Sequence, residues 1–147
     1  MQIFALLKED HAEVKGLLKK MTESGGAKTR QRFFQKLKPA LLAHAHAEEK
    51  TFYHALLQHD QTADLALEAA VEHQIVERLL EDMSNGALRP DQFSARCKVL
   101  RELFEHHVKE EEGHIFKAAR KVLAKNQLHE LSTQFEAVKE RQVQGID

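Results

Sequence analysis

Two stretches of twelve residues decide the fold of this chain: HAHAEEKTFYHA (residues 44–55) and HVKEEEGHIFKA (residues 107–118). Each stretch begins with a histidine and has a glutamate four residues later, and both are rich in residues that favour helices. The pairs are His44 with Glu48 and His107 with Glu111. Because residues four apart on an α-helix lie on the same face one turn apart, the two side chains of each pair can bind one ligand.

Four long segments carry apolar residues at helical spacing, and the two pairs continue that spacing. In chain order, these positions are Phe4, Leu7, His11, Val14, Leu18 and Met21; Leu37, Leu41, His44, Glu48, Thr51 and Ala55; Ala69, His73, Val76, Leu80 and Met83; and Phe93, Cys97, Leu100, Phe104, His107, Glu111, His114 and Ala118. Turn-forming stretches (ESGGAKT, LQHDQTAD and SNGALRPD) separate the segments, and no window alternates as a β-strand does. The short connections predict an all-α fold: an up-down-up-down antiparallel four-helix bundle.

A shorter fifth segment has Leu128, Leu131, Phe135 and Val138 along one stripe. This spacing predicts a short C-terminal helix that docks across an end of the bundle or mediates association into an oligomer. A length of 147 residues fits one domain. We therefore expect residues 1–124 to form the bundle, and residues 125–147 to form the C-terminal helix and tail of the same domain.

Composition limits the partners and the compartment. The chain has 22 lysines and arginines against 23 aspartates and glutamates, interspersed along the sequence, so we expect no binding to nucleic acid. The single cysteine, Cys97, cannot form an internal disulfide, and the N-terminus carries charges too early for a signal peptide or a membrane span. We therefore expect a cytoplasmic protein that does not insert into membranes. The unusual feature of the composition is its ten histidines, because a residue that titrates near neutrality and binds metals is seldom accumulated for packing alone.

The two stretches are part of a weak internal repeat. His11 lies 33 residues before His44, and His73 lies 34 residues before His107, so each pair has one preceding histidine at a matched offset. The first two segments and the next two segments therefore look like two copies of one helical hairpin. Such a repeat can build a site with pseudo-twofold symmetry at its centre.

Six side chains are expected to converge on the bundle centre and to bind metal: His11, His44, Glu48, His73, His107 and Glu111. A buried carboxylate without compensation costs several kcal/mol, and cations in the same cavity remove that cost. Each carboxylate can bridge two ions, so the set divides into two metals with two histidines each. Carboxylate and imidazole ligands suit iron, manganese or zinc. Six ligands do not fill two octahedral shells, which leaves room for a small molecule.

This arrangement resembles the hemerythrin family, in particular its HHE cation-binding branch, over roughly the first 120 residues. The family pattern is a histidine in the first helix, His-x-x-x-Glu in the second, a histidine in the third and His-x-x-x-Glu in the fourth, and it falls on the six residues named above. The resemblance implies a non-haem di-iron centre, oxo- or hydroxo-bridged, in which Glu48 and Glu111 bridge the metals. Oxygen-carrying hemerythrins have a further histidine where this chain has Glu77, which leaves either a more open site or an additional oxygen ligand. The prolines common after each motif are replaced by His54 and Lys117.

Three functional hypotheses follow. The first is a di-iron protein that binds or reduces dioxygen, peroxide or nitric oxide. The alternative is a module that senses iron or oxygen, or stores metal, without turnover, with the fifth helix as transmitter. The third is a helical interaction domain without metal.

The sequence leaves two interpretations open for His114 and for Tyr53. His114 is either a residue that supports the ligands or a surface residue, and Tyr53 either donates a hydrogen bond into the site or packs against a helix. Glu49 and Glu112 are expected to be charges on the outer face rather than ligands, although a shift of one residue in the helix register would exchange either with its neighbouring glutamate. Cys97 is expected to be an ordinary core residue. The remaining histidines are expected on the surface: His46, His54, His59, His106 and His129.

Overall fold

The structure of the protein, a computed structural model, describes residues 2–145, and within them it contains helices and turns but no strands. The elements in chain order are α1 (Ile3–Glu23), α2 (Ala27–Glu48), η1 (Glu49–Tyr53), α3 (His54–Leu56), α4 (Asp60–Met83), α5 (Pro90–Glu110), η2 (Glu111–Ile115), α6 (Phe116–Val122) and α7 (Lys125–Val143). The elements η1 and η2 are single π-helical turns. The prediction of an all-α fold is confirmed for these residues. The last two residues of the predicted tail lie outside them.

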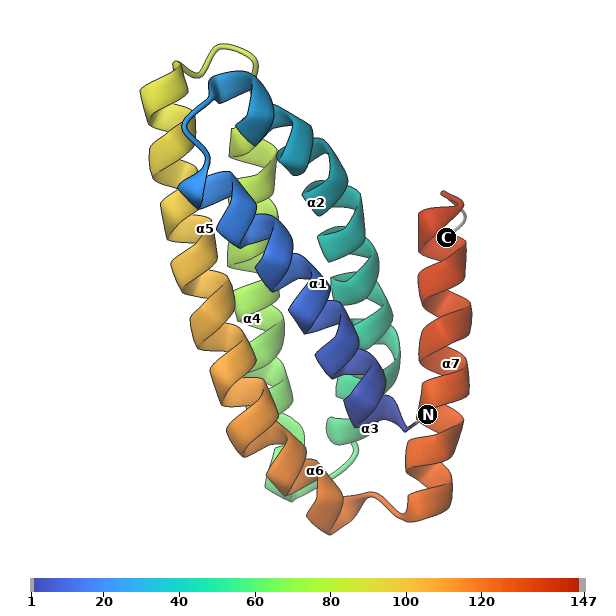
Figure 1. The fold of residues 1–147 in the computed structure, drawn as a ribbon. Coiled ribbons are helices and arrows are strands. Elements are labelled where there is room, and N and C mark those ends of the chain that lie inside the picture. The colour runs from blue at the N-terminus through green and yellow to red at the C-terminus, as the bar shows by residue number, and fades with distance from the viewer. Residues whose placement is uncertain (1, 146–147) are drawn as a thin grey trace.

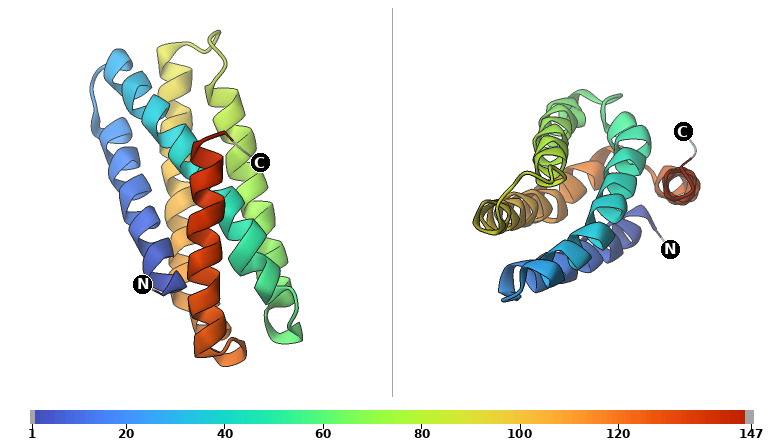
Figure 2. Two further views of the ribbon diagram at one scale, coloured as in Figure 1. Left: turned by 90° about the vertical axis from the view of Figure 1, so that its right-hand side faces the viewer. Right: turned by 90° about the horizontal axis from the view of Figure 1, so that it is seen from above.

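The four long helices α1, α2, α4 and α5 lie side by side with their axes roughly aligned (Figures 1 and 2). Helix α1 packs against both α2 and α5, and α4 packs against α5. The breaks between them follow local chemistry, because Gly25 and Gly26 precede α2 and Pro90 is the first residue of α5. Pro39 lies inside α2, and the chain remains helical through His54 and Lys117, the positions where the family's prolines are replaced.

Helix α7 packs lengthwise along α2 and η1 rather than across an end of the bundle (Figure 2). Leu128, Leu131 and Phe135 on its inner face are buried, as the stripe predicted. These side chains join the apolar cluster that also contains Ile3 and Phe52. The apolar face of α7 is therefore used within the chain.

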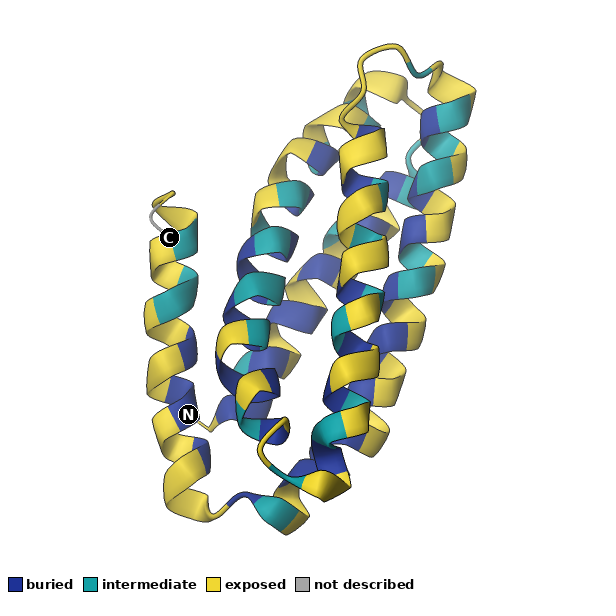
Figure 3. Ribbon diagram, turned by 180° about the vertical axis from the view of Figure 1, so that it is seen from behind, coloured by how far each residue is buried: buried dark blue, intermediate teal, exposed yellow. Residues whose placement is uncertain are grey.

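Two separate apolar clusters fill the interior, and a polar layer lies between them. Along α1, Leu7 belongs to the first cluster and Val14 to the second, and His11 lies between them. Along α5, Phe104 belongs to the second cluster, and His107 follows it directly on the same face. Figure 3 shows that the buried residues line the inner faces of all the long helices. The inward-facing positions predicted from helical spacing, here called the seam, therefore form most of the core, and a layer of histidines interrupts it.

The π-helical turns change which residues face inward beyond the glutamates. The seam predicted His114 and Ala118 as the next inward positions of the fourth helix, and this is wrong for His114, which is exposed. In η2 the wider turn moves the buried positions to Ile115 and Phe116. A π-helical turn accommodates one more residue than an α-helical turn, so the face of the helix shifts by one position.

Among residues 2–145, no helix combines the length and the apolar character that a membrane span requires.

Candidate metal centre

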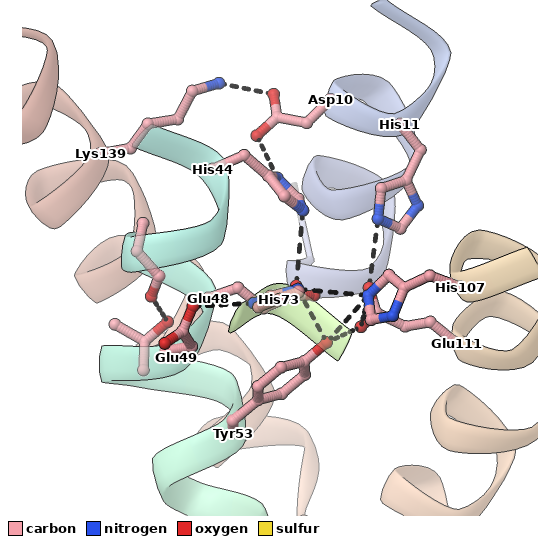
Figure 4. Close-up of polar contacts among 12 residues, drawn as sticks. Asp10, His11, His44, Glu48, Glu49, Tyr53, His73, His107, Glu111 and Lys139 are labelled. Carbon is pink, nitrogen blue, oxygen red and sulfur yellow. Dashed lines mark hydrogen bonds and ion pairs between the residues drawn. The ribbon is translucent and has the colours of Figure 1, made fainter. Parts of the chain in front are cut away.

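The six residues expected to bind metal all lie in the polar layer between the two apolar clusters, and all six are buried. Helix α1 supplies His11, α2 supplies both members of its pair and α4 supplies His73. The second pair spans the junction of α5 and η2. Glu48 and Glu111 have no exposed surface at all. Figure 4 shows the six side chains pointing toward one another from these different helices.

The four imidazoles form two pairs. The rings of His11 and His44 have centroids 5.0 Å apart, and the rings of His73 and His107 have centroids 4.8 Å apart. In the second pair the two Nε2 atoms are 3.2 Å apart. Nitrogen atoms of this kind, directed at a common point, are typical ligands of a transition metal.

Each buried carboxylate contacts one histidine from each pair. Glu48 Oε1 lies 3.5 Å from His44 Nε2 and 3.2 Å from His73 Nε2. Glu111 Oε1 lies 3.1 Å from His11 Nε2, and Glu111 Oε2 lies 3.5 Å from His107 Nε2. Both carboxylates are therefore shared between the two imidazole pairs.

Several polar atoms of this layer have no hydrogen-bond partner among the described residues: both carboxylate oxygens of Glu48, Oε1 of Glu111 and Nε2 of His11. Buried polar atoms left unpaired are costly, and a cation coordinated by them removes the cost. Two groups of ligand atoms, each within 4.8 Å of one another, could hold a metal ion: His11, His44, Glu48 and Glu111, and Glu48, His73 and His107. The donor set therefore fits metal cations.

Every one of the four imidazoles is also held from behind by a carboxylate at Nδ1. The bonded pairs and their distances are His11 with Glu112 (2.7 Å), His44 with Asp10 (2.8 Å), His73 with Glu49 (2.8 Å) and His107 with Glu72 (2.6 Å). Such a bond fixes the ring orientation and makes Nε2 a stronger ligand, as in the carboxylate–histidine–metal triads of known metal sites. All four Nε2 atoms therefore face the centre.

Glu49 and Glu112 were expected to be charges on the outer face rather than ligands, and neither is among the candidate ligand atoms, but both also contact the site. Each is about two-thirds buried and holds a histidine of a different helix. Sequence reasoning also missed Asp10 and Glu72, which directly precede His11 and His73. An acidic residue next to each of these ligands was the available signal, because a carboxylate beside a ligand on one helix can hold the ligand histidine of a neighbouring helix.

The four carboxylates that bond to Nδ1 of the histidines, here called the outer carboxylates, follow the internal repeat. Glu49 and Glu112 each follow a shared glutamate and hold the lone histidine of the opposite hairpin. Asp10 and Glu72 each precede a lone histidine and hold the first histidine of a His-x-x-x-Glu pair. The site therefore has pseudo-twofold symmetry in both its inner and its outer residues, as the repeat predicted for its centre.

In the metal-free protein, protons balance the buried negative charge. Burial on its own would lower the pKa of His44, but the charge of Glu48 and the hydrogen bond to Asp10 raise it to about 10. Burial is likewise outweighed at His107, where the bonds to Glu111 and Glu72 raise the pKa to about 10. Burial would raise the pKa of Glu111, but hydrogen bonds and nearby imidazoles hold it well below its usual value. These imidazoles are charged at neutral pH without metal, and a cation must displace their protons.

Tyr53 reaches the site, so of its two interpretations the structure supports the donor of a hydrogen bond into the site. Its hydroxyl donates a hydrogen bond to Glu111 and lies 3.2 Å from His107 Nε2. Burial, together with the charges of Glu111 and Glu48, raises the pKa of this phenol well above its usual value. The π-helical turn accounts for the position, because Tyr53 lies five residues after Glu48 and such a turn brings residues five apart onto one face. The equivalent residue of the second hairpin is Phe116, which has no hydroxyl.

A small cavity of about 20 Å³ adjoins the centre on the side of α2 and α4. All four site histidines line it, and its other walls are almost entirely apolar. Its remaining lining residues are Leu41, Leu42, Ala45, Val76, Glu77, Leu80 and Phe104. The cavity has room for a molecule about the size of water.

Two residues with open roles lie away from the ligand atoms. Glu77 lines this cavity, but it is half exposed, and its carboxylate lies 3.7 Å from His46 Nε2. It belongs to neither group of candidate ligand atoms. His114 is exposed, so it does not support the buried ligands.

Comparison with known families agrees with this geometry, since residues 2–119 match the sequence model of the hemerythrin HHE cation-binding domain. The chain belongs to the hemerythrin HHE family. The match contains all six candidate ligands of this HHE domain and ends before α7 begins. The resemblance recognised from the sequence is therefore confirmed.

A curated relative of this HHE protein is a DNA nickase from Nostoc sp. (strain PCC 7120), 28% identical over 141 residues. The alignment covers 96% of this chain but only 40% of the relative. The HHE chain thus spans about two-fifths of that protein's length. No solved structure matches the chain.

Proposed function

We propose that this HHE protein is a non-haem di-iron protein that binds or reduces a small oxidant at a carboxylate-bridged centre. The observation that carries the proposal is the sharing of two fully buried carboxylates, Glu48 and Glu111, between two pairs of imidazoles. Membership of a cation-binding family supports metal at this position. The unpaired buried oxygens support it independently, because a cation would satisfy them.

In this proposal His11 and His44 would hold one iron, and His73 and His107 would hold the other. Glu48 and Glu111 would be shared between the two. When bound, the two irons supply the electrons that reduce an oxidant. The outer carboxylates hold each imidazole so that its Nε2 faces inward, and the apolar clusters above and below the layer exclude water. Tyr53 can donate its hydroxyl proton as a hydrogen bond to an oxygen atom in the centre.

The apolar cavity beside the site favours dioxygen or nitric oxide over peroxide as the small ligand. An uncharged diatomic molecule makes weak hydrogen bonds to water and loses little when it enters a cavity whose walls, apart from the four histidines and Glu77, are apolar. Hydrogen peroxide would leave several hydrogen bonds unmade there, which costs about 1–3 kcal/mol for each group. We therefore rank the diatomic gases first.

The test is oxidant consumption by the iron-loaded protein. Protein loaded anaerobically with ferrous iron is mixed in turn with dioxygen, nitric oxide and hydrogen peroxide, with and without an external reductant, while the visible spectrum is recorded. We expect repeated consumption of dioxygen or nitric oxide when reductant is supplied, and its loss in Glu111→Gln. The exposed Glu81→Gln substitution is the matched control and should retain the wild-type rate. Consumption no faster than that of Glu111→Gln, together with no change of the visible spectrum on adding any of the three oxidants, would overturn the proposal.

A second candidate, sensing of iron or oxygen without turnover, is favoured by the contacts of α7. The Phe135 ring lies 5.8 Å from the His44 ring, and Lys139 Nζ lies 2.5 Å from Asp10, which holds His44. A change in the position of His44 would therefore be transmitted to α7. Hydrogen exchange of α7 amides with and without metal tests this, and a sensor would additionally change state once rather than turn over.

We propose that this chain acts without nucleic acid, although its relative bears the name DNA nickase. The near-neutral charge, with acidic and basic residues interspersed, supports this reading, because DNA binding depends on neutralising phosphates with lysine and arginine. A nicking assay on supercoiled plasmid tests it. Nicking by iron-loaded protein, above that of the same iron bound to a chelator and abolished in His44→Ala, would overturn it.

We also propose that the long helices form an up-down-up-down antiparallel bundle over residues 1–124, and that residues 125–147 belong to the same domain. The contacts of α7 with α1, α2 and η1 support this division. The cytoplasm remains the proposed compartment, since the lone Cys97 is buried and free.

A further inference from the structure

The outer face of α4 carries an apolar stripe that no part of residues 2–145 covers. Leu67, Val71 and Ile75 are each slightly more than half exposed, at 55%, 52% and 51%. They follow one another at intervals of four residues, so they form one continuous stripe on the helix. Figure 3 shows this side of the molecule, where α4 faces the viewer with its outer face exposed. A continuous exposed apolar stripe is a candidate binding surface.

The charges at the two ends of the stripe have opposite signs. Asp64 lies seven residues before Val71, and Arg78 lies seven residues after it. Both are exposed, and neither has an ion-pair partner within the described part of the chain. Seven residues are close to two helical turns, so both charges lie on the same face as Val71.

We propose that a second copy of this chain docks on the stripe, with the two α4 helices antiparallel about a twofold axis at Val71. In such an arrangement each residue faces the residue equally far on the other side of Val71. Val71 then faces Val71 of the partner subunit. Leu67 faces Ile75 of the partner subunit. Asp64 faces Arg78 of the partner subunit. The apolar contacts and the ion pairs each occur twice.

The same symmetry brings Asp60 toward Asp82 of the partner subunit, eleven residues from the centre, which would be unfavourable in close contact. Packed helices cross at an angle and diverge away from the crossing point. At about 16 Å from the centre these two aspartates are separated and solvated. The contact therefore consists of the central stripe and its flanking ion pairs.

This inference is independent of the proposed function, because the stripe lies on the outside of α4 and contains no candidate metal ligand. It also differs from association through the C-terminal helix, whose apolar face packs within the chain. A parallel helix pair would bring Asp64 against Asp64 and Arg78 against Arg78, so the charges favour the antiparallel arrangement.

Sedimentation equilibrium over a range of concentrations, on full-length protein, tests the proposal. We expect a monomer–dimer equilibrium in which Val71→Glu raises the dissociation constant at least tenfold, since it brings two carboxylates together at the axis. Val143→Glu, on the exposed face of α7, is the matched control and should leave dimerisation unchanged. Circular dichroism checks that each variant is folded.

A charge exchange tests the register independently of Val71. Asp64→Arg alone and Arg78→Asp alone should each weaken the dimer, and the double variant D64R/R78D should restore it toward wild-type affinity. A protein that stays monomeric at millimolar concentration would overturn the proposal. So would a dimer that Val71→Glu does not weaken, or single charge reversals that the double variant fails to rescue.

Discussion

The carboxylate behind His44 provides the sharpest test of how the outer residues support the site. All four histidine–carboxylate bonds have similar lengths, so burial decides which contributes most. The side chain of Asp10 is 10% exposed, whereas those of Glu112, Glu49 and Glu72 are 31%, 33% and 35% exposed. Solvent screens the Asp10 bond least, so its loss should cost most.

We expect Asp10→Asn to weaken metal binding toward the upper end of the roughly 10- to 100-fold range typical of such supporting carboxylates, about 2–3 kcal/mol. Glu49→Gln and Glu112→Gln should fall nearer tenfold. Competition titration with a chelator of known affinity measures these constants. Lys139→Met separates the loss of the Asp10 charge from the loss of its lysine partner, and it should have the smaller effect because Asp10 still holds His44.

The loss of metal affinity in Asp10→Asn should also change with pH in a defined direction. Asp10 also raises the pKa of His44 in the metal-free protein, so its removal reduces the competition from protons. The loss of affinity in Asp10→Asn should therefore be smallest in acid and should grow as the pH rises toward 10. Equal affinities of Asp10→Asn and the exposed control Glu105→Gln across this range would refute the supporting role.

Three further results are expected. The pKa values of His44 and His107 are raised to about 10, so protonation of these imidazoles stabilises the metal-free protein, fully below about pH 6.5. Urea denaturation of protein freed of metal by a chelator should show this stability being lost as the pH rises from about 6.5 to about 10. Tyr53→Phe should destabilise the metal-free protein by about 1–3 kcal/mol in the same assay, because Glu111 loses a buried donor; an unchanged midpoint would contradict the contact. Burial raises the pKa of Cys97 to about 11, so iodoacetamide at pH 8 should label it only after unfolding, and rapid labelling of native protein would count against this.

Sequence spacing was sufficient to find the residues that face the centre because helix geometry is local. The four-residue interval between His44 and Glu48 fixes their common face before any tertiary contact forms. The outer carboxylates could not be found in this way. Glu112 is 101 residues from His11 along the chain, and only the packing of α5, which continues into η2, against α1 brings them together. An acidic residue next to a ligand becomes meaningful only when that packing is known.

The positions beyond the glutamates could not be predicted for a different reason. A π-helical turn adds one residue to a helix, and no residue type marks both turns here, because η2 contains Gly113 whereas η1 contains neither glycine nor proline. Periodicity therefore carried the seam on to His114, whereas the structure buries Ile115. The same change brings Tyr53 to the site, five residues after a glutamate rather than four. Hydrophobic spacing reflects the average helical turn, so it does not reveal a single wider turn.

The most direct test of the two-metal centre is an anaerobic titration of the metal-free protein with ferrous iron, monitored by bound metal per chain. Two irons should bind to each wild-type chain, and Glu48→Gln, which removes an oxygen shared by both imidazole pairs, should lose at least one of them. Saturation at a single iron, or two irons retained unchanged in Glu48→Gln, would contradict a centre in which this carboxylate joins two metals.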